Sequence, residues 1–422
     1  MSKEKIFIFD TTLRDGAQTE GVDFSVEDKV KIAKRLSEIG LDYIEGGWPG
    51  ANPTDDKFFK NTPKFKKSKL VAFGMTRKNG KSANNDPGLN AVLNSGASAA
   101  CIVGKTWDFH VKKALQVSLE NNLSMIHDTI AYSSKRLDEV MFDAEHFFDG
   151  YKANKDYAKK TIETALSAGA KWIILCDTNG GTLPFELANI LNDITSIVPG
   201  DKLGVHFHND TDNATSNSLE AVRHGVCQVQ GTFNGLGERC GNVNLVNVIS
   251  NLCLKMNYKT NLKKKLKKIT SLSRFIDETL NRPSNRNLPF VGSAAFAHKG
   301  GLHISAVQKD PRSYEHIDPA SVGNQRVLVV SNQSGKSNII NQLKKIKISY
   351  GDDDKKLLNF IELTKNQEFL GYAYDGAEAS FELLARREVT KFKEFYTLES
   401  FKVFDERRKN SNGKYITISE AR

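Results

Sequence analysis

Eight short runs rich in apolar residues recur through the first 233 residues, and a stretch with helical periodicity follows each of them. The runs are KIFIFD (5–10), LDYIEGG (41–47), KLVAFG (69–74), AACIVGK (99–105), EVMFDAE (139–145), KWIILCD (171–177), KLGVHFH (202–208) and VCQVQGTF (226–233). Strands that alternate with helices indicate a parallel sheet, because a helix returns the chain between parallel neighbours.

The number of these units distinguishes between the possible parallel folds. Eight strand and helix units are complete by residue 257, which fits a (β/α)8 TIM barrel better than a doubly wound sheet with fewer strands. Within the first unit, Ser25 and Asp28 are placed to cap a helix, and Gly40 is placed to end it. We therefore predict a TIM-barrel catalytic domain over residues 1–270.

The sequence after the barrel differs in character. Residues 281–290 form a connector rich in Pro and Asn, and helical patterns follow it. For residues 271–395 we expect helical linker subdomains that contribute to the active site. Residues 396–422 have the pattern of two strands that stop before they could build a core. We interpret them as the truncated start of a C-terminal domain or as a tail.

Composition and charge argue against two classes of partner. The chain contains no stretch of 18 apolar residues, and its N-terminus lacks a signal-peptide core, so we expect a cytoplasmic protein without a membrane partner. The net charge is +10, but the densest lysine run, at residues 261–270, has no interleaved aromatic residues. It predicts a solvated face more readily than a nucleic-acid surface.

Polar side chains gather where the predicted strands end. In a TIM barrel the active site lies at the carboxyl ends of the strands, so this placement predicts an active site there. The residues at or just after these ends are Asp10, Arg14, Asp15, Glu45, Glu145, Asp177, Thr178, His206, His208 and Asn234.

A metal site is one interpretation of the seventh strand. His206 and His208 are two positions apart, so they face the same side of the strand, toward the mouth of the barrel. Asp15 follows the first strand and could complete an Asp and two-His set, while Asn242 offers an amide oxygen. Such a set accepts Mg, Mn or Zn. A core histidine bonded to backbone, and a plain loop around Asn242, are the alternatives.

Arg14 is adjacent to the potential metal ligand Asp15. A guanidinium in this position is suited to hold an oxyanion or a carboxylate. The alternative is a common salt bridge between an arginine and a helix-capping aspartate.

Four motifs in this order resemble those of a known family. DTTLRDGAQ (10–18), HFHND (206–210), GLGERCGN (235–242) and AFAHKGGLH (295–303) are similar to the acyl-CoA condensing synthases of the DRE-TIM metallolyase superfamily, which include 2-isopropylmalate, homocitrate and citramalate synthases. FDAEHFFDGYKAN (142–154) and CDTNGGTLP (176–184) resemble the citramalate synthase branch. The resemblance extends over residues 5 to about 405.

The resemblance implies a metal-dependent Claisen condensation of acetyl-CoA, the co-substrate, with pyruvate. The products would be (R)-citramalate and CoA, on the route to isoleucine through 2-oxobutanoate. By the same resemblance, the ligands of a divalent metal ion are Asp15, His206, His208 and Asn242.

The resemblance also implies roles for five further residues. Arg14 matches the arginine that steadies the keto oxygen, and Thr178 matches the threonine that binds the keto-acid carboxylate. Glu145 and His303 are the candidates for proton transfer, and the sequence leaves open which one removes the methyl proton. His303 and Tyr314 match a pair that the second protomer supplies, so a homodimer is expected.

Some features leave the specificity open. TDNATSNSL (211–219) departs from the family pattern, and Ala17 stands where many relatives have glutamate. Another keto acid, giving isopropylmalate or homocitrate, or a lyase reaction on the same barrel, are alternatives; Phe73, Met75 and Trp107 are candidate pocket walls. Relatives usually continue into a regulatory domain, so we expect no feedback inhibition from the residues present.

Overall fold

The computed structural model describes residues 5–62, 64–329, 336–349, 354–374, 376–390, 392–393 and 396–422. The chain divides into two compact units, one of Met1–Ala297 with Glu315–Val327 and the other of His298–Tyr314 with Leu328–Arg422. The boundaries expected from the sequence at residues 270 and 395 stay predictions.

The first unit contains a closed barrel in which eight parallel strands follow one another in chain order. The strands are Phe7–Asp10 (β1), Tyr43–Gly47 (β2), Lys69–Met75 (β3), Ala99–Lys105 (β4), Glu139–Glu145 (β5), Trp172–Asp177 (β6), Leu203–Phe207 (β7) and Gln228–Gly231 (β8). β8 pairs with β1 and closes the ring. The predicted TIM barrel is confirmed.

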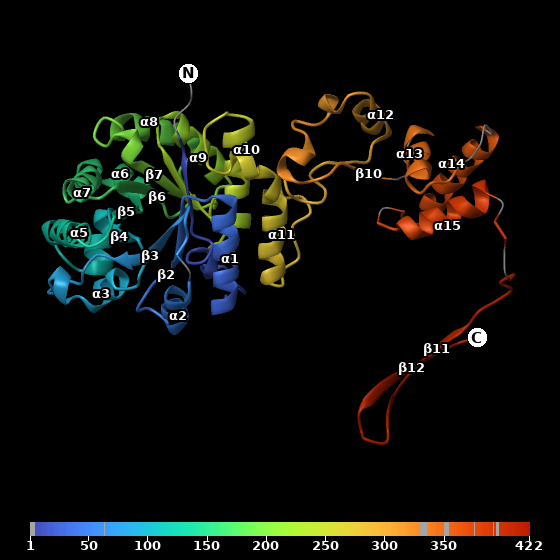
Figure 1. The fold of residues 1–422 in the computed structure, drawn as a ribbon, viewed down its shortest axis with the longest axis horizontal. Helices are drawn as coiled ribbons and strands as arrows, with labels where there is room; N and C mark the ends of the chain where they lie inside the picture. The colour runs from blue at the N-terminus through green and yellow to red at the C-terminus, as the bar shows by residue number, and fades with distance from the viewer. Residues whose placement is uncertain are drawn as a thin grey trace. The chain divides into compact units, whose positions relative to one another are not determined.

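Helices surround the barrel on its outer side (Figure 1). They are Val26–Ile39 (α1), Pro53–Asn61 (α2), Pro87–Leu93 (α3), Asp108–His110 (α4), Leu119–Ser133 (α5), Phe147–Ala153 (α6), Lys155–Ser167 (α7), Pro184–Ile194 (α8), Ala214–Arg223 (α9), Leu245–Leu254 (α10) and Ile269–Thr279 (α11).

Helix α1 shows how local sequence fixes an element. The side chains of Ser25 and Asp28 each accept a hydrogen bond from the backbone of the other, which satisfies donors that the helix start leaves unpaired. Gly40 ends the helix in the left-handed region, at φ 99°, where a side chain would be strained. The buried positions Ile32, Leu36 and Ile39 form the face that packs on the barrel.

The interior of the barrel is closed at its amino end by aromatic side chains. The rings of Phe7 and Trp172 pack edge to face, with centroids 5.2 Å apart. The indole of Trp172 donates to the Tyr43 hydroxyl at 3.2 Å, and that hydroxyl donates to Glu139 at 2.9 Å. Since this end is filled, an open site is left for the carboxyl ends of the strands.

The second unit is mostly helical. Its helices are Gly301–Lys309 (α12), Lys336–Lys345 (α13), Asp354–Phe369 (α14) and Glu378–Val389 (α15). The two strands expected near the end are present as an antiparallel hairpin of Val403–Lys409 (β11) and Tyr415–Ala421 (β12). Across the described ranges, every helix is too short or too polar to cross a bilayer.

Candidate functional site

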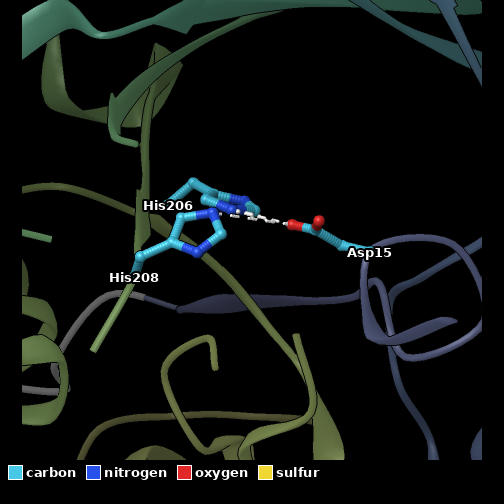
Figure 2. A group of neighbouring side chains, drawn as sticks. All are labelled: Asp15, His206 and His208. Atoms are coloured by element: carbon cyan, nitrogen blue, oxygen red, sulfur yellow. Dashed lines mark ion pairs between the residues drawn. The ribbon is translucent and has the colours of Figure 1, made fainter. Parts of the chain in front are cut away.

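Asp15, His206 and His208 form a compact group at the carboxyl end of the barrel (Figure 2). His206 lies in β7, His208 follows it, and both side chains point toward the Asp15 carboxylate. Nε2 of His206 is 3.1 Å from Oδ2 of Asp15, and Nε2 of His208 is 4.0 Å from the same oxygen. One ligand atom from each residue lies within 4.8 Å of the others, which is compact enough for a single cation.

Burial and charge set the pKa values in this group. Burial alone would raise the pKa of Asp15, but Arg14 and the two histidines hold it below its ordinary value. Burial would lower the pKa of His206, but the hydrogen bond and charge of Asp15 raise it. Burial and the neighbouring His206 lower the pKa of His208 to about 4. The group therefore presents an ionised carboxylate and, at His208, a neutral imidazole.

Asn242 lies beside this group in the loop after β8. It forms an isolated antiparallel bridge with His208, and its amide nitrogen donates to the Leu236 carbonyl at 3.1 Å. Its Oδ1 is buried and has no hydrogen-bond partner in the part of the chain that the structure describes. A buried acceptor left unpaired costs about 1–3 kcal/mol, so this oxygen is a reasonable position for a ligand contact. Gly237 allows the approach, since a Cβ there would lie 2.3 Å from the amide nitrogen of Asn242.

Arg14 is held on three sides. Its Nε donates to Glu45 at 2.7 Å, and its Nη1 is 3.2 Å from Asp15. The guanidinium lies over the ring of Phe73, 4.0 Å from the centroid. The salt bridge with Asp15, which the sequence offered as the alternative explanation of Arg14, is therefore present. Arg14 also lines a cavity together with Asp15, His206 and His208.

Glu145 ends β5 and forms an ion pair with Lys105, which ends β4. The β4–β5 register places the two residues side by side. Thr178 follows β6, and its hydroxyl accepts a hydrogen bond from the backbone N–H of His146 at 2.9 Å. A hydroxyl has one donor, so the Thr178 O–H is left to donate elsewhere.

A cavity of about 360 Å³ joins these residues. Arg14, Asp15, Glu145, Thr178, His206 and His208 all line it. Its apolar wall contains two of the three side chains expected there, Phe73 and Met75, together with Trp48 and Val103.

The expectation for Trp107 is wrong. This side chain stacks on the ring of His110, with centroids 5.1 Å apart, and does not belong to the cavity wall. Trp107 lies two residues after the end of β4 in sequence, but helix α4 begins directly after it, and its ring packs on a residue of that helix.

His303 and Tyr314 belong to the second compact unit. Their rings stack with centroids 4.1 Å apart, so they form one pair within that unit. Their expected role at the barrel site stays a prediction.

The structure adds site residues that the motifs did not single out. Lys105 and Asp143 line the cavity from β4 and β5, and Gln230 on β8 bonds to His206 at 3.0 Å. The sequence did contain a signal for two of these residues. Asp143 and Gln230 are polar residues among the apolar ones of a buried strand, and such residues often belong to a site.

Arg239, in the loop after β8, also lines the cavity. It donates to the Thr178 carbonyl at 2.8 Å and to both oxygens of Asp210 at 2.7 and 2.9 Å. In the segment that departs from the family pattern, the Thr211 hydroxyl donates to the Gly180 carbonyl at 2.7 Å. These contacts connect the ends of β6 and β7 to the loop after β8.

Two family descriptions match the chain in succession. Residues 5–276 match the HMGL-like family, and residues 290–366 match the homocitrate synthase post-HMGL domain-like family.

Curated relatives are similar over nearly the whole chain. The (R)-citramalate synthase of Aquifex aeolicus is 46% identical over 99% of this chain and 79% of its own length. That of Geobacter sulfurreducens is 48% identical over 95% of this chain and 76% of its own length. The 2-isopropylmalate synthase of Sulfurisphaera tokodaii is 34% identical over 87% of this chain and 93% of its own length.

Solved structures share the fold. The HMG-CoA lyase of Bacillus subtilis superposes with a TM-score of 0.59 and 24% identity, covering 68% of this chain and 98% of the lyase. The hydroxymethylglutaryl-CoA lyase of Pseudomonas aeruginosa has a TM-score of 0.58 and 18% identity, covering 67% of this chain and 95% of the lyase. At these sequence identities the similarity shows a shared fold and nothing further.

Proposed function

The chain belongs to the HMGL-like family and, within it, to the (R)-citramalate synthases, and we propose that it condenses acetyl-CoA with pyruvate. Water then cleaves the thioester of the product, which gives (R)-citramalate and CoA. The observation that carries this proposal is the higher identity to (R)-citramalate synthases than to 2-isopropylmalate synthases. In the cell the reaction would feed isoleucine synthesis through 2-oxobutanoate.

The proposed ligands of a divalent metal ion are Asp15, His206, His208 and Asn242. The compact donor set and the unpaired buried oxygen of Asn242 fit such an ion. Mg, Mn and Zn are all compatible with these donors. When bound, the cation would polarise the keto group of the acceptor.

Arg14 and Thr178 would orient the keto acid. Arg14 is fixed between Glu45 and Phe73, so its remaining N–H groups can stabilise the keto oxygen as it gains negative charge. The Thr178 hydroxyl, which already accepts from the backbone of His146, can donate to the carboxylate of the substrate. Both side chains line the same cavity.

The methyl proton of acetyl-CoA must be removed by a base. Glu145 is one candidate, because it lines the cavity and its ion pair with Lys105 keeps the carboxylate in place. His303, with Tyr314 stacked on it, is the other candidate, and we propose that a second protomer of a homodimer supplies this pair.

Release of free thiol from acetyl-CoA tests the proposal. The purified protein is assayed with pyruvate, 2-oxobutanoate, 2-oxoisovalerate and 2-oxoglutarate, with Mg²⁺ or Mn²⁺ present. We expect the highest kcat/KM with pyruvate, and a preference for any other keto acid would refute the citramalate assignment. The His208→Ala variant should lose both metal binding and turnover, and unchanged values of both would refute the ligand assignment.

A further inference from the structure

We propose that Gln230 is a positioning residue that fixes the imidazole of His206 with its Nε2 toward Asp15. It does so by joining Nδ1 of His206 to Asp143 across the barrel. This inference rests on the proposed metal site and deepens it, because it assigns the group that sets the tautomer of one ligand.

The strand register places Gln230 next to His206. The two residues are partners in the parallel pairing of β7 and β8, and both are buried. Parallel partners in register have side chains on the same face of the sheet, here the interior of the barrel. Oε1 of Gln230 lies 3.0 Å from Nδ1 of His206.

The other end of the amide determines which atom faces the imidazole. Nε2 of Gln230 donates to Oδ1 of Asp143 at 3.3 Å and lies 3.9 Å from the thiol of Cys101. With its nitrogen committed to the carboxylate, the amide presents its oxygen to His206, and an oxygen can only accept.

The tautomer of His206 follows from this contact. Nδ1 must carry the proton that the Gln230 oxygen accepts, so the proton on Nε2, which faces Asp15, is the one that the ring loses when it becomes neutral. The lone pair of the neutral ring is then on Nε2. Nε2 is the atom that lies 3.1 Å from Asp15 and belongs to the proposed ligand set. A partner on the far nitrogen of a ligating histidine orients the ring and raises its basicity.

Gln228 provides a control within the same strand. It lies two positions earlier on β8, is fully buried and faces the same interior. Its amide nitrogen lies 3.9 Å from the sulfur of Met141, and its Oε1 has no partner among the described residues. Gln228 therefore matches Gln230 in residue type, strand and burial, but its amide nitrogen contacts Met141 and not the ligand group.

The first experiment compares Gln230→Leu with Gln228→Leu. Each purified full-length variant is treated with chelator, and Mn²⁺ binding is measured by calorimetry. We expect Gln230→Leu to weaken Mn²⁺ binding about 10- to 100-fold, which is the usual effect of losing a group that hydrogen-bonds to a metal ligand. Gln228→Leu should bind Mn²⁺ as the wild type does. Equal affinity in Gln230→Leu and the wild type would overturn the proposal.

A second experiment, for the case that Gln230→Leu does not fold, exchanges the donor and the acceptor between positions 230 and 143. Gln230→Glu retains an acceptor for His206 but sets a carboxylate against the carboxylate of Asp143, so we expect weakened Mn²⁺ binding. Adding Asp143→Asn restores a donor opposite Glu at position 230, and the double variant should recover most of the affinity. If the double variant binds Mn²⁺ no better than Gln230→Glu alone, the bridge has no role in positioning.

These readouts are separate from the proposed reaction. A wild-type protein that binds Mn²⁺ but releases no CoA with pyruvate would refute the function and leave the role of Gln230 intact. Full turnover together with equal Mn²⁺ affinity in Gln230→Leu would refute the role of Gln230 and leave the function intact.

Discussion

Arg14 and Phe73 stack at the carboxyl end of the barrel, with the guanidinium 4.0 Å from the centre of the ring. The same guanidinium donates its Nε to Glu45 at 2.7 Å. A planar group can use its face for the ring and its edge for the carboxylate at once, which a lysine ammonium cannot do. The position therefore requires the geometry of arginine as well as its charge.

The Arg14→Lys variant tests this requirement. It keeps a positive charge but loses the planar edge that, in the proposed reaction, would face the developing negative charge. We expect kcat to fall by about 10²- to 10³-fold, as for loss of one oxyanion donor. The measurement is steady-state CoA release with pyruvate, with circular dichroism as the control for folding. A folded variant with the kcat of the wild type would contradict the role.

Two asparagines in the loop after β8 allow a paired test of the metal site. Asn242 has an unpaired buried oxygen beside His208, whereas Asn244 caps α10 by accepting from the Val246 N–H at 3.0 Å. Asn242→Ala should weaken Mn²⁺ binding by more than about tenfold. Asn244→Ala should lower the free energy of unfolding by about 1 kcal/mol and leave Mn²⁺ affinity unchanged. Equal Mn²⁺ affinities in the two variants would exclude Asn242 as a ligand.

The sequence was sufficient to predict those structural features that are encoded by neighbouring residues. The eight strands lie where the apolar runs predict them, because each run and its helix are encoded within about 30 residues. His206 and His208 share a face because strand periodicity is also local. The cap formed by Ser25 and Asp28 belongs to the same class of signal.

Contacts that depend on strand register could not be predicted in this way. Lys105 and Glu145 pair across β4 and β5, and Gln230 reaches Asp143 across the barrel. Sequence spacing does not reveal which residues are level with one another in neighbouring strands. The error at Trp107 has a related cause, since its position near a strand end did not reveal that its ring packs on His110.

Arg239 should act on substrate binding through Thr178. It holds the Thr178 carbonyl at 2.8 Å while its ion pair with Asp210 fixes the guanidinium. In Arg239→Gln we expect kcat/KM for pyruvate to fall about 10- to 100-fold, mainly through KM, because Thr178 is then less well placed. Arg223 is the control, since its ion pair with Glu220 joins two residues of one exposed helix face.

The kinetic parameters of the two arginine variants distinguish a role of Arg239 in positioning the substrate from a role in the reaction step. Arg223→Gln should keep the kcat and KM of the wild type. If Arg239→Gln also keeps them, the contact with the Thr178 carbonyl does not position the substrate. If kcat falls and KM stays constant, Arg239 acts on the reaction step and the positioning role is wrong.

Asp10 should make stability fall as the pH rises. Burial raises the pKa of Asp10 to about 7, although Thr12 donates to both carboxylate oxygens, at 3.0 and 2.8 Å. In the unfolded chain this carboxyl titrates near pH 4. Between about pH 4 and 7 the folded protein thus keeps a proton that the unfolded chain has lost, and the free energy of unfolding decreases with pH.

Comparison with Asp10→Asn isolates this group from the other titrating residues. The variant carries no ionisable side chain at this position, so its free energy of unfolding lacks the contribution of Asp10. The difference, variant minus wild type, should increase from about pH 4 to 7, by at most about 1.4 kcal/mol per pH unit, and level off above that range. Urea unfolding followed by circular dichroism at several pH values measures it. A difference that is constant with pH would show that Thr12 keeps the carboxylate charged despite its burial.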